Sequence, residues 1–508
     1  MVFDGFETAF ENWLDPENRW VCLSRIIPWS ELSAPYNQTL SNHMGRPAKD
    51  ARLVIGAVII KHKLCLSDEE TIDQIRENPY LQYFVGFKEF HKEQAFAPSL
   101  FVEIRRRMGA EVFASFEQSI ITLMQDRKKP AMPDDDRTEP VGTGPKLSTD
   151  DEVKKEPNQG TIILDATVAE QAIRYPTDLG LLNEAREISE AIIDTLHPLT
   201  GLATKVRTYR RKARQNYLAL VKQRRPGAKK RRHGTGQQLQ YLKRNLGHIE
   251  KMLDMLPGQE IPLTYKQLRQ YWVIQNVYHQ QKVMFDTKTR RCDDRIVSIH
   301  QPHVRPIVRG KQNKPAEFGA KFGVSLTQDK IACVDQFSWD AYHEGQDLQG
   351  QVEAYRKRHG HYPGKVLADP AYGTRENRCF LKNLGITFAG KPLGRPKKTV
   401  DGKDPDRQQR QQDYRDRIPI EGKFGQGKNG YDLNYIRART AQTSEAWIKS
   451  IFLVMNLLVL SEFYFAFITK LLSSPLGTHL VDKITRLTAW IGSFVAIPKQ
   501  KPSRLAAF

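Results

Sequence analysis

The stretch 413–433, DYRDRIPIEGKFGQGKNGYDL, places one glutamate among several cations and a tyrosine. Tyr414, Arg417, Glu421 and Lys428 follow one another at intervals of 3, 4 and 7 residues. On a continuous helix these intervals put all four side chains on one face. The neighbouring cations would keep the carboxylate ionised. The spacing therefore predicts a metal-binding carboxylate beside an Arg and a Lys that can hold phosphate groups.

Pro419 conflicts with a continuous helix through this stretch. Proline is tolerated in the first turn of a helix and disfavoured in its interior, because it lacks the backbone N–H. The sequence therefore predicts a helix that begins near Ile418, with Tyr414 and Arg417 just before it.

Two aspartates outside this stretch follow apolar, strand-like runs. Asp165 lies near the expected end of a strand over 161–166, and Asp369 ends the strand in KVLADPAYG. They are 204 residues apart (369 − 165), so only tertiary structure can bring them together. Mg²⁺ prefers carboxylate oxygens, and two such ions about 4 Å apart stabilise an in-line phosphoryl displacement. The competing interpretation of each aspartate is a turn or cap residue.

The charge of the chain points to a polyanionic partner. Its 508 residues hold 78 Lys and Arg against 58 Asp and Glu, a net charge of +20 with an isoelectric point near 9.6. Lys and Arg bind nucleic acid by releasing counterions from phosphates, and we therefore expect a nucleic-acid partner. The alternative is a soluble protein whose positive charge does not serve to bind nucleic acid.

The run 205–233 concentrates this charge. It holds 13 Lys or Arg and neither Asp nor Glu. A run without a compensating acid favours phosphate contacts over a merely solvated helix face. The basic residues expected to contact DNA, in this run and in the N-terminal GRPAKD segment, are Arg210, Arg211, Lys212, Arg214, Arg231, Arg232 and Arg46.

Cysteine use and apolar runs bear on the compartment. Five scattered cysteines without a CxxC pair fit reduced thiols and no zinc finger, and the acidic N-terminus does not resemble a signal peptide. The most apolar run, 451–472, carries Glu462 near its centre, which would be costly in lipid. We expect a cytoplasmic protein with no membrane contact and a buried helix there, a transmembrane span being the alternative.

The remaining patterns predict helices at the start of the chain and a mixed sheet after it. Asp50 can cap a helix to about Leu64, and Ser67 with Glu70 forms a capping box for the next one. The segment 128–160, rich in Pro, Gly and charge, predicts a disordered linker. Strand patterns are expected over 161–166, 295–301, 318–338, 365–369 and 386–392, with helices between them, so the fold class is α/β.

The four residues of the opening stretch also carry a resemblance. Tyr, two residues, Arg, three residues, Glu, six residues and Lys is the signature of DDE transposases of bacterial insertion sequences, and every spacing is met here. Asp165 in ILDATV and Asp369 in LADPAYG match the two family aspartates. The segments IRYPTDLGLLNEAREI and GRPAKDARLVIGAVIIKHKLCLSDEETIDQIRENPYLQYFVGF resemble the IS-five superfamily.

The resemblance implies a ribonuclease-H-like fold that binds two Mg²⁺ ions, with Mn²⁺ as an alternative, through Asp165, Asp369 and Glu421. Tyr414, Arg417 and Lys428 would position double-stranded DNA of the element ends and of the target, held by a homodimer. The domains expected are a helical N-terminal DNA-binding domain (1–127), the linker (128–160), a catalytic domain (161–472) with a basic helical insertion (179–290), and a C-terminal helical tail (473–508).

Two other functions stay open at this level. One is a metal-dependent nuclease of the same fold that cuts DNA without joining it. The other is a DNA-binding protein whose catalysis has decayed, although the intact set of three acids speaks against decay.

Overall fold

The computed structural model describes residues 10, 13–40, 48–126, 157–256, 261–311, 314–390, 393–394 and 407–472. The predicted C-terminal tail, most of the predicted linker and Arg46 lie outside these residues.

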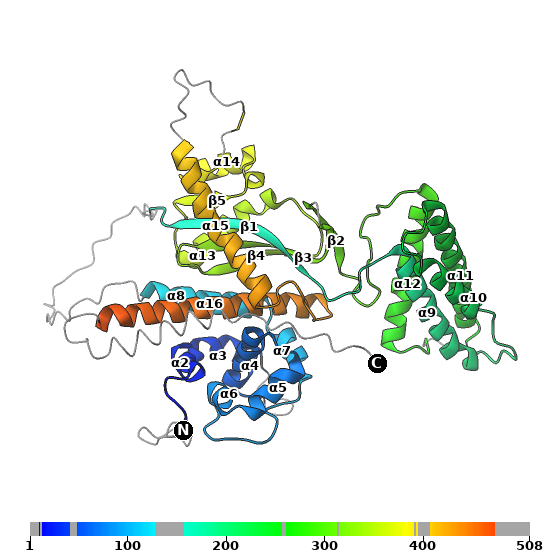
Figure 1. Cartoon of the computed structure of the whole chain (residues 1–508), viewed down its shortest axis with the longest axis horizontal. Helices are drawn as coiled ribbons and strands as arrows, with labels where there is room; N and C mark the ends of the chain where they lie inside the picture. Colours follow the sequence, from blue (N-terminus) through cyan, green and yellow to red (C-terminus); the bar gives the residue numbers. More distant parts are fainter. Residues whose placement is uncertain are drawn as a thin grey trace, which may run out of the picture.

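A six-stranded mixed sheet forms the centre of the chain (Figure 1). The central strand β1 (Thr161–Glu170) pairs antiparallel with β3 (Lys314–Thr327) on one side and parallel with β5 (Lys365–Ala368) on the other. Beyond β5 lies the parallel strand β6 (Thr387–Ala389). The other edge of β3 is shared by β2 (Arg305–Lys311) and β4 (Ala332–Ser338), both antiparallel to it. The predicted mixed sheet flanked by helices is confirmed.

β1 is longer than the sequence predicted, and this changes the place of Asp165. The strand runs to Glu170 because β3 pairs with it along nearly its whole length. β5 pairs only with its first part, up to the Leu164–Ala368 pair. Asp165 therefore lies in the middle of β1, where the parallel neighbour ends, and the prediction that it lies near the strand's end was wrong.

A second correction concerns 295–301, which is not a strand. Ile296 and Ile299 are buried in the core of a helical bundle, so their apolar pattern reflects packing against helices. The strand before β3 is instead β2, which the sequence did not reveal.

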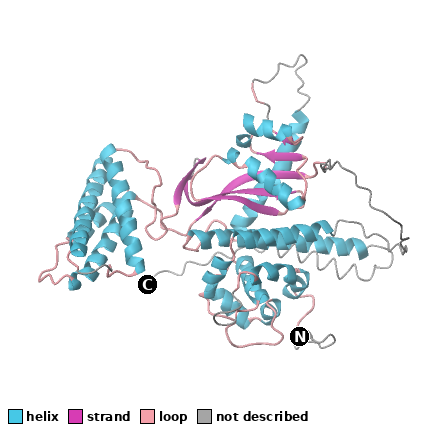
Figure 2. Ribbon diagram, turned by 180° about the vertical axis from the view of Figure 1, so that it is seen from behind, coloured by secondary structure: helices cyan, strands magenta, loops and turns pink. Residues whose placement is uncertain are grey.

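The bundle stands beside the sheet as an insertion between β1 and β2 (Figures 1 and 2). Its helices bury a hydrophobic core of their own, which includes Leu182, Leu242 and Ile274. Thr177 caps the first helix by accepting a hydrogen bond from the Gly180 N–H. The helices are α9 (Asp178–Leu196), α10 (Arg210–Val221), α11 (Ala228–Asp254) and α12 (Tyr265–Thr287), and a short 3₁₀ helix, η1 (His197–Leu199), follows α9.

The N-terminal part of the chain is helical and joins the central core. The Asp50 cap and the Ser67–Glu70 capping box are both confirmed. Its helices are α2 (Arg19–Ile26), α3 (Trp29–Asn37), α4 (Ala51–Leu64), α5 (Asp68–Glu77), α6 (Pro79–Phe84), α7 (Leu100–Arg107) and α8 (Ala110–Asp126). They share one hydrophobic cluster with α16 (Ala441–Leu472) and with one face of the sheet.

α16 runs between the N-terminal helices and the sheet (Figure 2). Within the described residues its segment Ala441–Glu462 is long and apolar enough to cross a membrane, and 83% of the apolar window is buried inside the protein. Burial against both neighbours explains the apolar sequence and confirms the predicted core helix over 451–461, while the side chains of 463–472 lie outside the described residues.

The two faces of the sheet are covered by different helices. Alternation along β1 directs Ile162 and Leu164 into a cluster with α13 (Leu348–His359), and Ile163 and Ala169 into the cluster with α16. Asp165 belongs to the second face, which α15 (Arg407–Gly430) also contacts. The remaining elements are η2 (Glu344–Gln346), η3 (Pro370–Tyr372) and α14 (Arg375–Asn383).

Candidate active site

α15 carries the four residues of the opening stretch on one unbroken helix. The helix includes Pro419 in its interior, so the prediction that it begins near Ile418 was wrong. Ile420 and Phe424 are buried, and α15 contacts β1 and β5. Their burial offsets the cost of an interior proline, which is about 3 kcal/mol.

Three carboxylates from separate elements surround the guanidinium of Arg417. Its Nη2 lies 2.8 Å from Oε1 of Glu421, one helical turn further along α15. Its Nη1 lies 3.8 Å from Oδ2 of Asp165 and 3.8 Å from Oδ2 of Asp369. The tertiary structure thus brings together the two aspartates and the glutamate that the sequence selected, with Arg417 between them.

The register of the sheet explains why the two aspartates meet. Leu164 of β1 lies opposite Ala368, the last residue of β5. The residue that follows each of them in the chain is an aspartate, so Asp165 and Asp369 lie side by side. Asp369 starts the η3 turn, and its Oδ1 accepts the Ala371 N–H at 3.1 Å. The Oδ1 of Asp165 accepts the N–H of Ala166 at 2.8 Å. Each aspartate thus fixes one oxygen on the backbone and directs the other towards Arg417.

Burial sets Asp165 apart from the other two acids. Its side chain is 17% exposed, against 43% for Asp369 and 50% for Glu421. Desolvation raises the pKa of Asp165 to about 6, opposed by the Ala166 N–H and by Arg417, while Glu344 and Asp369 raise it further. Removal of water thus outweighs the attraction of the guanidinium at this position.

The acids match a hard divalent cation in chemical type, since carboxylate oxygens are the ligands that Mg²⁺ prefers. Three carboxylates also exceed the charge of the single guanidinium between them. Within the described parts of the chain, however, no three acidic, His or Cys side chains are close enough to hold one ion. In this structure the cation that the three acids share is the Arg417 guanidinium.

The other two signature residues lie on the same helix. The Tyr414 side chain is 62% exposed, and the Arg417 guanidinium lies 5.9 Å from the centre of its ring. Lys428 is partly buried near the end of α15, two turns beyond Glu421. A face of α15 that carries two cations, a phenol and a carboxylate therefore borders the acid cluster.

Sequence reasoning missed three residues beside this cluster. Lys321 of β3 is 9% exposed and forms a 2.9 Å ion pair with Glu344, whose charge raises the pKa of Asp165. Tyr372 in η3 is fully buried, and its hydroxyl has no hydrogen-bond partner among the described residues. A lysine between the apolar residues of FGAKFGV and a tyrosine three residues after Asp369 were the available signals.

The basic run 205–233 is not free of acidic partners. Arg210 binds both carboxylate oxygens of Asp194 in α9, with its Nη2 2.7 Å from Oδ1, and Lys205 lies 2.6 Å from the same oxygen. The premise that this run lacks a compensating acid was therefore wrong for Arg210. The other predicted DNA contacts in this run are exposed on the bundle surface: Arg211, Lys212, Arg214, Arg231 and Arg232.

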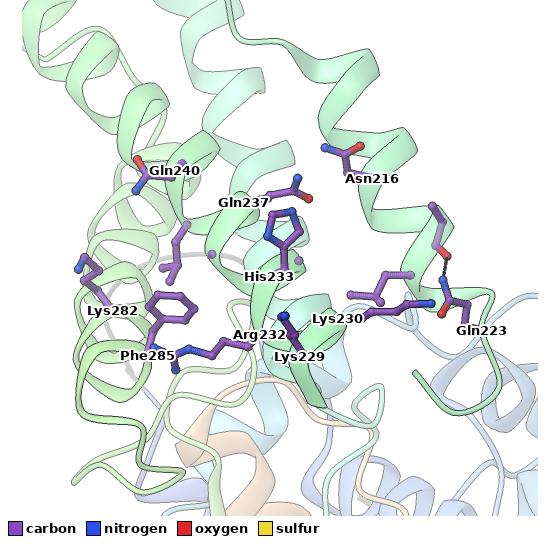
Figure 3. Close-up of a pocket in the computed structure, with 15 residues that line it drawn as sticks. Asn216, Gln223, Lys229, Lys230, Arg232, His233, Gln237, Gln240, Lys282 and Phe285 are labelled. Carbon is purple, nitrogen blue, oxygen red and sulfur yellow. Dashed lines mark hydrogen bonds between the residues drawn. The ribbon is translucent and has the colours of Figure 1, made fainter. Parts of the chain in front are cut away.

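A basic groove of about 890 Å³ lies between α10, α11 and α12 (Figure 3). Lys229, Lys230 and Lys282 line it together with Arg232, whose guanidinium lies 4.1 Å from the centre of the Phe285 ring. Among the residues that line the groove none is acidic. Part of the basic run predicted from the sequence thus lines a groove that also contains the aromatic ring of Phe285.

Comparisons with known proteins match two separate parts of the chain. Residues 366–458 match the family described as "Transposase DDE domain", and residues 8–107 match "Transposase domain (DUF772)". The first match includes Asp369, Arg417 and Glu421, whereas Asp165 and the helical bundle fall outside both. A protein of Rhizobium meliloti described as "Uncharacterized protein ORF8 in nfe locus" is 28% identical over 185 residues, 36% of this chain and 77% of that protein. No solved structure matches.

Proposed function

From the transposase DDE domain that the chain carries, we propose that it catalyses metal-dependent cleavage of DNA at the ends of an insertion sequence and transfer of those ends into target DNA. The observation that carries this proposal is the convergence of Asp165, Asp369 and Glu421 on one guanidinium. A mixed sheet flanked by helices supports the ribonuclease-H-like fold that such a domain implies.

The three acids would hold two Mg²⁺ ions, or Mn²⁺ ions in their place, which would stabilise the attacking and leaving oxygens of the phosphoryl displacement. Asp165 and Asp369 each keep one oxygen on a backbone N–H, so their outer oxygens are fixed in direction. Glu421 stands on a rigid helix. The two aspartates therefore have little conformational freedom to lose when they bind a ligand.

Arg417 changes partners in this proposal. In the DNA-free chain it pairs with the acid cluster, and on binding of DNA it would turn towards a phosphate, which an Arg fork can bind through two hydrogen bonds. Lys428 and Tyr414 on the same helix would hold the neighbouring phosphates. The terminal DNA is thereby positioned beside Glu421.

Two displacements follow in the proposed reaction. Water attacks the phosphodiester at the element end and releases a 3′-hydroxyl, which then attacks a phosphodiester of the target and expels a target 3′-hydroxyl. No covalent link between protein and DNA forms in either step. The basic bundle surface would hold DNA through phosphates, and a homodimer in the cytoplasm would pair the two ends.

The test is a cleavage and strand-transfer assay on DNA that flanks the gene, with Mg²⁺, comparing the wild-type chain with Asp369→Asn and Glu421→Gln. Both variants should lose cleavage and keep DNA binding. Cleavage without joining of a supplied 3′-hydroxyl end would instead identify the nuclease alternative. Binding without cleavage by the wild-type chain would identify the decayed DNA-binding protein.

A second measurement tests the change of partners by Arg417. Mn²⁺ binding to the DNA-free chain is followed by electron paramagnetic resonance. Arg417→Gln should bind Mn²⁺ more tightly than wild type, since a competing cation is gone. Weaker Mn²⁺ binding in a folded Arg417→Gln protein would contradict this role.

A further inference from the structure

A second hollow, a cleft of about 620 Å³, lies between the helical bundle and the body that carries the sheet. It begins where β1 leaves the sheet. There Gln171 forms an isolated bridge with Ile436, and the N–H of Ala172 donates to the Ile436 carbonyl at 2.9 Å. The cleft is therefore attached to the strand that carries Asp165.

Two exposed tyrosines line this cleft. Tyr175 is 72% exposed, and its ring stands edge-on to Phe318 of β3, with ring centres 5.6 Å apart and a plane angle of 90°. Tyr265 is 83% exposed and is the first residue of α12, directly after the Thr264 capping box. Both rings are thus open to solvent, as surfaces for stacking are, and the Tyr175 ring also packs against Phe318.

The charge that lines the cleft is positive. Arg174, Lys266, Arg269 and Arg439 line it, and its one acid, Glu184, lies 3.1 Å from Nε2 of His300. Gly180 in the first turn of α9, Tyr265 at the start of α12 and Thr440, the residue before α16, also line it. Helix N-termini carry partial positive charge, which adds to the field of the side chains.

We infer that this cleft binds unpaired nucleotides of a DNA strand, with bases against Tyr175 and Tyr265 and phosphates against Arg174, Arg269 and Arg439. The inference rests on the proposed function, which brings DNA to the acid cluster. Interleaved aromatic rings and cations are the features that recognise single strands. A hollow of this size has the volume of a small-ligand pocket and does not enclose a duplex.

The position of the cleft fits the path of such a strand. Seven residues of extended chain separate Asp165 from Ala172, about 23 Å at 3.3 Å per residue. At the rise of about 3.4 Å per nucleotide in duplex DNA, this distance corresponds to about seven nucleotides between the cleft and the acid cluster. The cleft would hold a segment that has been separated from its complement near the scissile phosphate.

The test measures binding of the full chain to two fluorescent probes in EDTA: an oligothymidylate of about ten nucleotides and a blunt duplex of about two helical turns. Tyr175→Ala and Tyr265→Ala should each raise the Kd for oligothymidylate about tenfold and change the Kd for the duplex by less than about twofold. Tyr175→Phe should bind as wild type does, because the ring is retained. Lys357→Gln, an exposed lysine on α13 that does not line the cleft, is the matched control and should change neither.

The inference is overturned if the alanine variants bind oligothymidylate as wild type does, or lose duplex affinity by the same factor. The second result would mean that the cleft contacts duplex DNA. Both tyrosines are exposed, so a folding defect is not expected, and melting temperatures of the variants verify this. Since the assay contains no metal, a chain that binds oligothymidylate through both tyrosines and yet fails to cleave would refute the proposed function alone.

Discussion

Asp165→Asn should make the protein more stable at neutral pH while it abolishes DNA cleavage. The carboxylate is largely buried, and its pKa in the folded protein, about 6, lies above the usual 3.8. Folding therefore disfavours the ionised form. An amide of the same shape avoids this desolvation, although it removes a proposed metal ligand.

The magnitude and the pH range follow from the two pKa values. A raised pKa in the folded state means that the native chain binds more protons than the unfolded chain between pH 3.8 and about 6, so the stability of the wild type falls as pH rises through this window. The loss is complete above pH 6 and corresponds to about 3 kcal/mol in the free energy of unfolding. Asp165→Asn should therefore gain up to about 3 kcal/mol at neutral pH and nothing near pH 3.8.

The assay is urea unfolding of both proteins in EDTA at several pH values, followed by the same series with Mg²⁺. A ligand that binds only the native state raises its stability, so Mg²⁺ should stabilise wild type more than the variant. A variant that is less stable than wild type at neutral pH in EDTA would refute the reasoning. It would mean that attraction to Arg417 outweighs desolvation at Asp165.

Three further predictions concern other parts of the molecule. Lys428→Ala should reduce strand transfer more than metal binding; unchanged activity per folded molecule with a lower Tm would show that the lysine only caps α15. Replacing Arg211, Lys212 and Arg214 by Gln should weaken binding to all DNA sequences alike. The slope of log K against log salt concentration should become less steep by up to about one unit per lost phosphate contact, and an unchanged slope would show that this helix face is only solvated. Asn456→Leu should lower the free energy of unfolding by about 1–3 kcal/mol in urea titrations, since its amide pairs two backbone groups at the start of β4; an equally stable variant would contradict this.

Local patterns in the sequence predicted several features correctly. The Asp50 cap and the Ser67–Glu70 capping box depend on groups within three residues of each other, so no distant contact is needed to form them. The interval between Arg417 and Glu421 is one helical turn, and their side chains do form an ion pair. The strand before Asp369 was likewise visible as an apolar run between turn residues.

Tertiary contacts decided the features that the sequence did not predict. β1 extends beyond Asp165 because β3, more than 140 residues later in the chain, supplies hydrogen-bond partners as far as Glu170. α15 continues through Pro419 because Ile420 and Phe424 become buried. In both cases the free energy that fixes the element comes from a partner that local propensity does not contain.

The same distinction applies to charge. The sequence by itself selected the candidate residues for a metal ion and for phosphates, because such candidates follow from side-chain chemistry and from spacing along one helix. Only the tertiary structure decided that Asp165 and Asp369 meet at the end of β5, that Arg417 lies between the acids, and that Asp194 binds Arg210. Electrostatic energy depends on the distance between charges and on their burial, and neither quantity can be read from the order of residues along the chain.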